Sequence, residues 1–255
     1  MNVALIQSEL HWEAPAKNRE MFEQKISILN SNIDVIVLPE MFTTGFTMAP
    51  EKLAEKWPGL SVRWMQRIAK SKKSAIVGSL VVEENACFFN RLIFVKPEGE
   101  VITYNKRHLF RMGDEHLHYS SGSERIVVEW KGFRILLLIC YDIRFPVWCR
   151  NNDDYDLIII VANFPEKRKD AWNVLLKARA IENQCYVTGC NRIGTDGNGI
   201  AYSGESQIIN PGGVVIQKAE ANQNCTISAD LSIDQLRSFR SDFPVQLDKD
   251  DFIIK

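Results

Sequence analysis

Short runs of apolar residues alternate with polar turns over most of the chain, and their length and β-branched content are typical of buried strands. The first run is Asn2–Gln7. The others cover residues 33–38, 74–82, 87–96, 101–104, 126–130, 133–139, 157–161, 185–191, 206–210, 214–217 and 226–230. Glycine-containing turns at 97–99, 131–132 and 211–213 join consecutive runs, so these pairs are expected to form hairpins.

Residues 16–30 and 57–73 have apolar side chains at helical spacing, and we expect two further helices at 145–151 and 169–183. Strands that alternate with helices and hairpins predict an α/β fold, a mixed sheet with helices outside it. No linker interrupts the pattern. We therefore expect one domain over 1–255, with a core to about residue 230 and a tail over 231–255. The tail ends in the apolar Phe252-Ile-Ile254, which either packs on its own subunit or docks on a partner.

The composition of the chain mainly excludes classes of binding partner. Of the 255 residues, 45% are hydrophobic and 25% are charged, and the formal net charge is −1. This is the profile of a soluble globular protein, and it gives no reason to expect nucleic acid or a membrane as a partner. The first residues lack a signal-peptide pattern. The six cysteines show no CxxC pair or disulfide framework, so we expect a cytoplasmic protein with free thiols.

Three strand-like runs end near a side chain that can take part in catalysis. Residues 35–38 lead to Glu40, residues 101–104 lead to Lys106, and Arg134-Ile-Leu-Leu-Leu-Ile-Cys140 ends in a thiol. Hydrolysis of an amide by a thiol needs a proton acceptor and positive charge beside the carbonyl oxygen. None of the four histidines stands in a Cys-His-Asn context. We therefore expect Cys140 as nucleophile, Glu40 as base, and Lys106 with the backbone N–H of Tyr141 as oxyanion donors.

In this order, the three segments resemble the signature blocks of the nitrilase (carbon-nitrogen hydrolase) superfamily. The matching blocks are Leu38-Pro-Glu40, Tyr104-Asn-Lys106-Arg-His-Leu109 and Cys140-Tyr-Asp-Ile-Arg-Phe-Pro146, within a likeness that runs from Val3 to about Asp230. The resemblance implies a nitrilase-type α-β-β-α sandwich, with two mixed six-stranded sheets and outer helices. It also implies a homodimer or higher homo-oligomer. We expect no cofactor and no metal.

The superfamily has a second glutamate after the lysine, which holds the lysine and the reacting amide. Glu115 is the match, Asp114 is its competitor, and a solvated loop carboxylate is the plain alternative. Glu115, His116 and His118 could also form a metal cluster, but no further ligand is evident at metal-site spacing. Residues 106–121 are expected to be an irregular loop that carries functional groups.

Other charged and glycine-rich positions have structural interpretations. Asp142 and Arg144 are expected to form an ion pair that fixes the turn after the nucleophile, although Arg144 could instead receive a substrate carboxylate. Arg179 and Glu182 lie three apart on one helix face and are expected to be a buried pair near the site. The glycine-rich segment 194–204 is expected to be a plain loop, because it lacks the strand-loop-helix setting of a phosphate cradle.

Longer segments resemble the omega-amidases, a branch of the superfamily that deaminates α-ketoglutaramate and α-ketosuccinamate. These segments are Glu40-Met-Phe42-Thr-Thr-Gly45-Phe46-Thr-Met48, Val161-Ala-Asn163-Phe164-Pro165, and residues 108–119 and 178–184. The resemblance implies that the substrates are water and a short dicarboxylic acid monoamide.

The same resemblance assigns a small, flat pocket to aromatic side chains. Phe42, Phe46 and Phe164 would wall it, unless any of them belongs to the core, and Phe164 stands where the family often has tryptophan. Arg144 and the Asn163-Phe164 backbone are candidates for binding the far carboxylate. Two alternatives stay open. One is a related amidase or N-carbamoyl hydrolase of other specificity, and the other is a catalytically silent nitrilase-fold binding protein.

Overall fold

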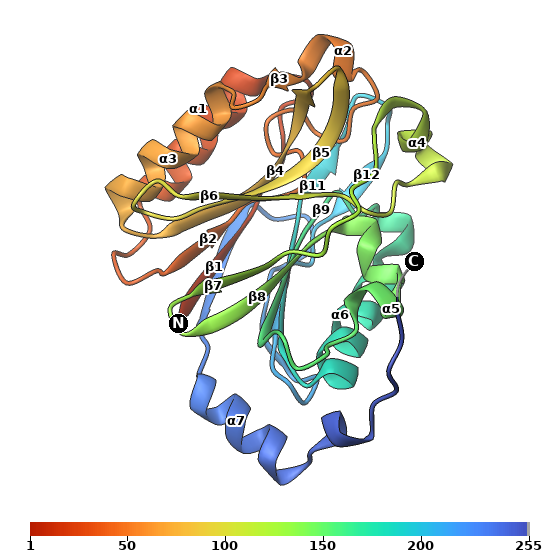
Figure 1. Cartoon of the computed structure of the whole chain (residues 1–255). Helices are drawn as coiled ribbons and strands as arrows, with labels where there is room; N and C mark the ends of the chain where they lie inside the picture. The colour runs from red at the N-terminus through yellow and green to blue at the C-terminus, as the bar shows by residue number, and fades with distance from the viewer. Residues whose placement is uncertain (254–255) are drawn as a thin grey trace.

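Two large β-sheets lie face to face in the computed structural model, which describes residues 1–253 (Figure 1). The first sheet has the strand order β15-β1-β2-β4-β5-β6, and the two-residue strand β3 pairs with β4. Its strands are β1 Asn2–Gln7, β2 Val35–Val37, β3 Glu55–Lys56, β4 Ala75–Glu84, β5 Cys87–Val95, β6 Val101–Asn105 and β15 Cys225–Asp230. The added β3 makes this sheet seven-stranded where six strands were expected.

The second sheet has the order β14-β13-β10-β9-β8-β7 and six strands, as expected. They are β7 Val127–Trp130, β8 Phe133–Ile139, β9 Leu157–Ala162, β10 Tyr186–Asn191, β13 Gln207–Ile209 and β14 Val215–Lys218. A separate two-stranded sheet joins β11 Ile193–Thr195 to β12 Ala201–Ser203. The expectation of a plain loop over 194–204 is therefore wrong, since both ends of this segment pair as antiparallel strands.

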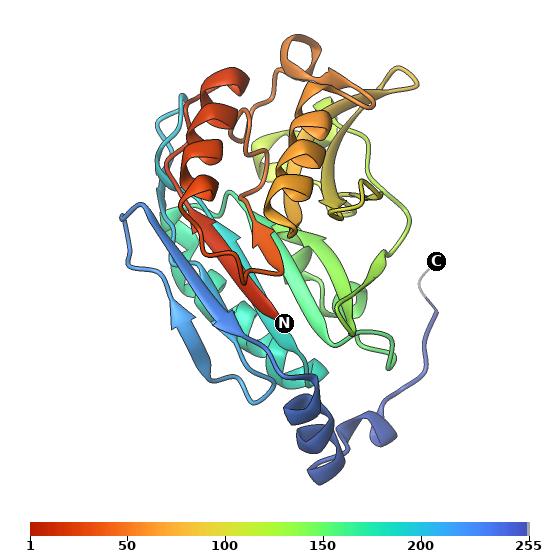
Figure 2. The same ribbon diagram turned by 90° about the vertical axis from the view of Figure 1, so that its left-hand side faces the viewer.

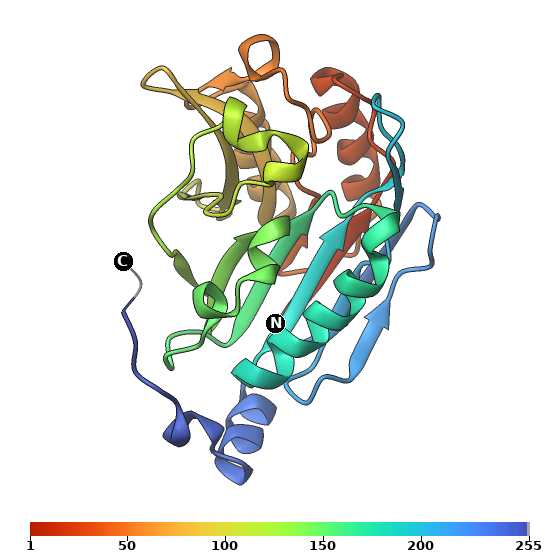
Figure 3. The ribbon, with the colours of Figure 1, turned by 90° about the vertical axis from the view of Figure 1, so that its right-hand side faces the viewer.

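Helices cover the outer faces of both sheets, α1 and α3 on the first (Figure 2) and α6 on the second (Figure 3). The helices are α1 Pro15–Ser27, α2 Pro50–Leu53, α3 Leu60–Lys72, α4 Glu115–His118, α5 Pro146–Cys149, α6 Lys169–Asn183 and α7 Ile233–Asp242. The short 3-10 turns are η1 Arg111–Gly113, η2 Cys140–Arg144, η3 Glu166–Arg168 and η4 Val245–Asp248. No helix within residues 1–253 is long and apolar enough to span a bilayer. This arrangement confirms the mixed α/β sandwich.

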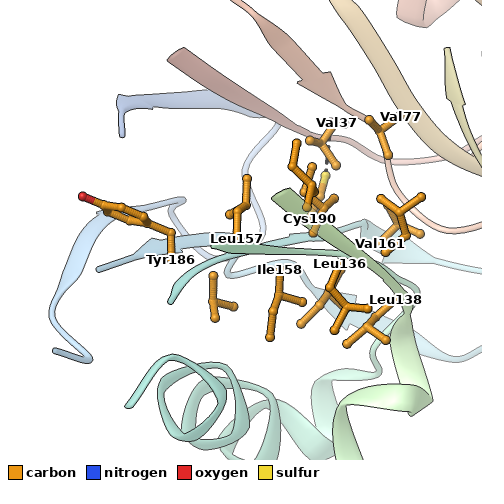
Figure 4. Packing of buried hydrophobic residues seen from close by; sticks show 14 of the residues in the cluster. Val37, Val77, Leu136, Leu138, Leu157, Ile158, Val161, Tyr186 and Cys190 are labelled. Atoms are coloured by element: carbon orange, nitrogen blue, oxygen red, sulfur yellow. Dashed lines mark hydrogen bonds between the residues drawn. The ribbon is translucent and has the colours of Figure 1, made fainter. Parts of the chain in front are cut away.

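The strands have apolar side chains on both faces because both faces are buried. Val37 of β2 faces the second sheet, whereas its neighbours Ile36 and Leu38 pack toward α1 and α3. Figure 4 shows Val37 and Val77 opposite Cys190, whose thiol donates a hydrogen bond to the Val37 carbonyl at 3.4 Å. Burial on both faces explains why the strands are continuous apolar runs in the sequence.

Two stretches differ from the sequence interpretation. Residues 106–121 are not wholly irregular, because η1 and α4 form short helical turns within them. The tail after β15 contains α7 and η4 and then follows the outside of the molecule (Figure 1). Near its end Ile253 is 89% exposed. Phe252 is 39% exposed, so its own subunit covers much of Phe252 but little of Ile253, and Ile254 lies outside the described residues.

Candidate active site

The candidate catalytic residues lie where strands of the two sheets end. Glu40 follows β2 by three residues, Lys106 directly follows β6, and Cys140 directly follows β8. The strands β2 and β8 are each parallel to sheet neighbours, and parallel strands bring the residues at their carboxyl ends to one edge. Glu115 comes to the same place as the first residue of α4.

One lysine and two glutamates form a buried charge cluster at this edge. The Lys106 ammonium lies 2.9 Å from Glu40 Oε1, and 3.0 and 2.9 Å from the two Glu115 oxygens. The Lys106 side chain is 1% exposed and both glutamate side chains are 0% exposed. A buried charge is stable only when it is paired and hydrogen-bonded, so the three side chains fix one another. Asp114, the competitor of Glu115, is exposed and has no part in this cluster.

Asn90 is a member of the cluster that the sequence analysis missed. Its side-chain amide on β5 donates to Glu40 Oε1 at 2.8 Å and to Glu115 Oε1 at 3.2 Å. Asn90 thus fixes the two carboxylates next to each other. A lone asparagine inside the apolar run 87–96 was the available signal, because a buried polar side chain needs a partner.

Asn163, at the end of β9, ties Glu40 to the second sheet. Its backbone N–H donates to Glu40 Oε2 at 2.7 Å, and its side-chain amide donates to the Glu40 carbonyl at 2.6 Å. Glu40 is therefore held from three sides, by Lys106, Asn90 and Asn163. The carbonyl of Asn163 also accepts a hydrogen bond from the Cys140 thiol at 3.8 Å. These bonds place the thiol beside the carboxylate expected to act as its base.

Burial and ion pairing shift the pKa values of the cluster in opposite directions. Burial alone would lower the pKa of Lys106, but the carboxylates of Glu115 and Glu40 outweigh it and raise that pKa above its usual value. Lys106 is therefore a permanent cation. Burial also raises the pKa of Glu115, and Glu40 adds to this effect while Lys106 opposes it. Lys106 thus stabilises the carboxylate form of Glu115, the residue that holds it in place.

The backbone at Cys140 is strained. Its φ is +43°, in the left-handed region that a non-glycine residue seldom adopts. This conformation turns the chain sharply from β8 into η2. Burial is the main cause that raises the pKa of the Cys140 thiol well above its usual value, and the Glu40 carboxylate adds to it while Lys106 opposes it. The resting side chain is therefore a thiol, and it needs a base at the moment of attack.

Asp142 fixes the turn after Cys140, but not through the expected partner. Its carboxylate accepts hydrogen bonds from the Tyr104 hydroxyl at 2.7 Å and from the backbone N–H of Ile139 at 3.0 Å. It also meets the backbone N–H and the ring of His108, at 3.0 and 2.8 Å. The expected Asp142–Arg144 ion pair is wrong, because these donors occupy Asp142 while Arg144 lies against the Phe164 ring.

A second anchor of the same turn comes from α6. The Arg179 guanidinium donates through Nε to the Ile143 carbonyl at 2.9 Å and pairs with Glu182 at 2.6 Å. Arg179 is buried, whereas the Glu182 side chain is 35% exposed. The predicted pair forms, although only its arginine is buried, and it connects α6 to the segment that carries Cys140.

A cavity of about 440 Å³ opens above the thiol. Its wall is largely aromatic and cationic. The residues that line it are Phe46, Lys106, Phe110, Met112, Gly113, Cys140, Tyr141, Arg144, Asn163, Phe164, Pro165, Glu166, Lys167, Arg168, Gly199, Ile200, Ala201 and Tyr202. Phe46, Tyr141, Arg144, Asn163 and Phe164 were expected here. The cavity is therefore built from loops of both sheets and from the β11–β12 hairpin.

Phe42 does not belong to this wall. It is fully buried among Phe22, Trp64 and other residues between the first sheet and its helices. Gly78 on β4 makes room for it, because a Cβ there would lie 2.8 Å from the Phe42 ring. The expectation that Phe42 walls the pocket is therefore wrong. The chain between Glu40 and Phe46 turns, so that one aromatic ring enters the core and the other the cavity.

The metal-cluster interpretation finds no support in the geometry. Both Glu115 oxygens are taken by Lys106 and by the Phe110 N–H, the latter at 2.6 Å. Among residues 1–253, no three His, Cys, Asp or Glu side chains converge on a point that could hold a metal ion. The described side chains of His116 and His118 therefore have no third ligand beside them.

Comparisons with known proteins agree with this geometry. Omega-amidase YafV of Escherichia coli (strain K12) is 48% identical over 254 residues, which cover 99% of this chain and 98% of that protein. The 2-oxoglutaramate amidase of Bacillus subtilis (strain 168) is 35% identical, with 95% of each chain covered. A solved structure of a CN-hydrolase superfamily protein from Xanthomonas campestris, with an arsenic adduct in its active site, is 41% identical. Its TM-score is 0.97, with 100% of this chain and 99% of that one covered.

The family model described as carbon-nitrogen hydrolase matches residues 2–241. This match contains Glu40, Lys106, Glu115 and Cys140. The chain belongs to the carbon-nitrogen hydrolase family.

Proposed function

We propose that this protein is an omega-amidase, which hydrolyses the terminal amide of short dicarboxylic acid monoamides, with α-ketoglutaramate preferred. The observation that carries the proposal is the buried cluster of Glu40, Lys106 and Glu115 beside the Cys140 thiol, at the base of one cavity. The full-length similarity to an omega-amidase and a 2-oxoglutaramate amidase supports the choice of substrate. The cluster supplies a nucleophile, a base and a fixed cation, the set that amide hydrolysis by a thiol needs.

The first step forms a thioester. Glu40 accepts the thiol proton while Cys140 Sγ attacks the amide carbon, so a C–S bond forms and the carbonyl oxygen becomes an anion. The Lys106 ammonium and the Tyr141 N–H stabilise that anion. When the carbonyl re-forms, the C–N bond breaks, Glu40 returns its proton to the leaving nitrogen, and ammonia departs.

The second step restores the enzyme. Glu40 accepts a proton from water as the water oxygen attacks the thioester carbon, and Lys106 again stabilises the oxyanion. Collapse breaks the C–S bond, releases the dicarboxylic acid and returns a proton to Cys140. Glu115 acts by position in both steps. It holds the ammonium through two oxygens and is itself held by the Phe110 N–H.

The cavity wall suits a short, flat substrate. Phe46 and Phe164 lie on it with Tyr141, and the Lys106 ammonium lies 5.2 Å from the centroid of the Phe46 ring. Such a wall favours a small acyl group over a bulky one. Arg144 is the cation on η2 that can meet the far carboxylate. The Asn163-Phe164 backbone, the other expected candidate, cannot bind it, because its two N–H groups donate to Glu40 Oε2 at 2.7 Å and to Asn191 Oδ1 at 2.8 Å.

Ammonia release by the purified enzyme tests the proposal. α-Ketoglutaramate, succinamate, glutamine, an N-carbamoyl amino acid and an aromatic nitrile are compared at equal concentration. We expect α-ketoglutaramate to react fastest and succinamate to follow it. Faster hydrolysis of glutamine, the nitrile or the carbamoyl compound contradicts the omega-amidase proposal but leaves the thiol mechanism standing. No turnover of any compound favours a silent binding protein.

We also propose that residues 1–255 form one cytoplasmic domain that assembles as a homodimer or higher homo-oligomer. Two apolar side chains on the outer face of α6 support this assembly. Val174 and Ile181, seven residues apart and so on one helix face, are 64% and 55% exposed. Sedimentation of the wild type should give at least a dimer, and Val174→Glu with Ile181→Glu should give a monomer. A monomeric wild type contradicts the assembly.

A further inference from the structure

Two guanidinium groups on the cavity wall have no carboxylate partner among residues 1–253. Arg144 forms no hydrogen bond or ion pair within these residues, and its guanidinium lies 5.6 Å from the centroid of the Phe164 ring. Arg168, the last residue of η3, lies 5.2 Å from the centroid of the Phe110 ring. Its hydrogen bond goes to the thioether of Met112, at 2.9 Å. A thioether is a weak acceptor, so Arg168 keeps nearly all its capacity to donate.

Several other arginines of this protein pair with carboxylates. Arg134 and Arg240 both pair with Asp156, at 2.9 Å each, and Arg91 pairs with Glu84 at 2.7 Å. Arg144 and Arg168 have no such partner within residues 1–253, and among the arginines that lack one they are the two that line the cavity. Glu166 is a carboxylate on the described wall, and it lies outside ion-pair distance of both Arg144 and Arg168. Lys106 is assigned to the reacting carbonyl and not to the far carboxylate, because Glu40 and Glu115 hold its ammonium in the buried cluster beside Cys140.

The two arginines reach the cavity from two different turns. Arg144 ends the turn that begins with Cys140, whereas Arg168 ends the turn that follows Asn163-Phe164-Pro165. Each guanidinium is backed by an aromatic ring, which restricts its side chain and leaves its N–H groups available. An arginine fork presents two parallel donors that match the two oxygens of a carboxylate.

We propose that Arg168 is a specificity-determining residue that binds the far carboxylate of the substrate together with Arg144. This inference rests on the proposed omega-amidase function and deepens it. A carboxylate that enters the cavity loses water, and it is stable there only when it is paired. Arg168, at the end of η3, supplies that pairing together with Arg144 of η2. A neutral amide of the same length gains nothing from it, so Arg168 selects acid amides without taking part in bond breaking.

The test compares an acid amide with a neutral one. kcat and KM are measured for succinamate and for butyramide, which carries a methyl group in place of the carboxylate, in wild type and in Arg168→Met. The ratio of the two kcat/KM values should fall by about 10- to 100-fold in the variant, the range expected for a lost hydrogen bond to a charged group. The loss should come mainly from a higher KM for succinamate. Arg168→Lys, which keeps the charge but not the fork, should recover part of it.

Lys169→Met is the matched control, because Lys169 is an exposed neighbouring cation outside the cavity wall. Its selectivity ratio should equal that of the wild type, and thermal unfolding should show that all variants fold. An unchanged ratio in a folded Arg168→Met overturns the inference, as does an equal change in Lys169→Met. A wild type that prefers butyramide overturns the proposed function instead. A fall of kcat alone, equal for both amides, assigns Arg168 a structural role and also overturns the inference.

Discussion

Replacing Lys106 by methionine removes the one cation that three carboxylate oxygens share, and it keeps much of the packing of the side chain. Glu40 and Glu115 then face each other in a site where neither is exposed to solvent. Removing one partner from a buried pair costs about 3–5 kcal/mol of folding free energy, because the remaining charge stays uncompensated. The rate should fall as well, by about 10²–10³, as expected for one lost oxyanion donor.

The stability loss should depend on pH. Burial raises the pKa of Glu115 in the folded protein, and Lys106 opposes that rise. Without the ammonium the pKa rises further, so the folded variant binds a proton more tightly than the unfolded chain does. Such a group favours folding below its unfolded pKa, about 4.3 for glutamic acid, and loses this contribution as the pH rises through its folded pKa. The deficit of Lys106→Met should therefore be largest at neutral pH and shrink on acidification.

Urea unfolding at several pH values, together with ammonia release, measures both effects. Lys106→Met with Glu115→Gln is the informative control, since it removes one positive and one negative charge together. This double variant should regain most of the stability and none of the activity. If Lys106→Met folds normally and keeps more than about a tenth of the wild-type kcat, a limit set by the donor-loss figure, the role assigned to Lys106 is wrong. A deficit independent of pH would refute the account of Glu115.

Three further predictions concern the neighbours of the cluster. Asn90→Leu removes the amide that bridges Glu40 and Glu115. The kcat should therefore fall by at least about 10-fold, the scale of one hydrogen bond to a charged group. An unchanged kcat would show that the two carboxylates are aligned without Asn90. Asp142→Ala leaves the O–H donor of Tyr104 and the backbone N–H groups of His108 and Ile139 without the acceptor that they share. Urea unfolding should show a loss of about 2–4 kcal/mol, the scale of unsatisfied buried groups, and a loss below about 1 kcal/mol would show that the turn stands without Asp142. Because the pKa of Cys140 is raised, the ultraviolet difference spectrum between wild type and Cys140→Ser should lack the thiolate band at pH 7 and gain it only at alkaline pH. A thiolate band at neutral pH would mean that Lys106 outweighs burial and Glu40.

The sequence predicted the strands well because their physical cause is local. Runs such as 133–139 and 157–161 are buried on both faces, and an apolar run between turns is the direct consequence. The short elements were harder. The strand β3 has two residues and β12 three, too few for a period, and they exist because of the strands they pair with. Tertiary contact decides such elements.

In the candidate site, too, local sequence features were predicted and long-range contacts were not. Glu40, Lys106 and Cys140 were expected because each follows a strand-like run, and Glu115 was expected from the resemblance to family motifs. The structure brings all four together. Phe42 and Phe46 are four residues apart in a turn, and no pattern in the sequence says which ring enters the core. Asp142 and Arg144 are neighbours in sequence, but the partners of Asp142 come from β6 and the segment after it, through Tyr104 and His108. Contacts across long sequence separations were therefore the part that a local reading could not supply.

Trapping of the acyl-enzyme tests the central claim most directly, that Cys140 carries the substrate as a thioester. Enzyme and succinamate, which has no keto group that hydroxylamine would convert to an oxime, are mixed with hydroxylamine, which competes with water for a thioester and converts it to a hydroxamate. Wild type should release one ammonia for each acid or hydroxamate formed, with the hydroxamate share rising with hydroxylamine. A folded Cys140→Ser should form neither product at a measurable rate. Ammonia release without any hydroxamate, or substantial turnover by Cys140→Ser, would contradict the account.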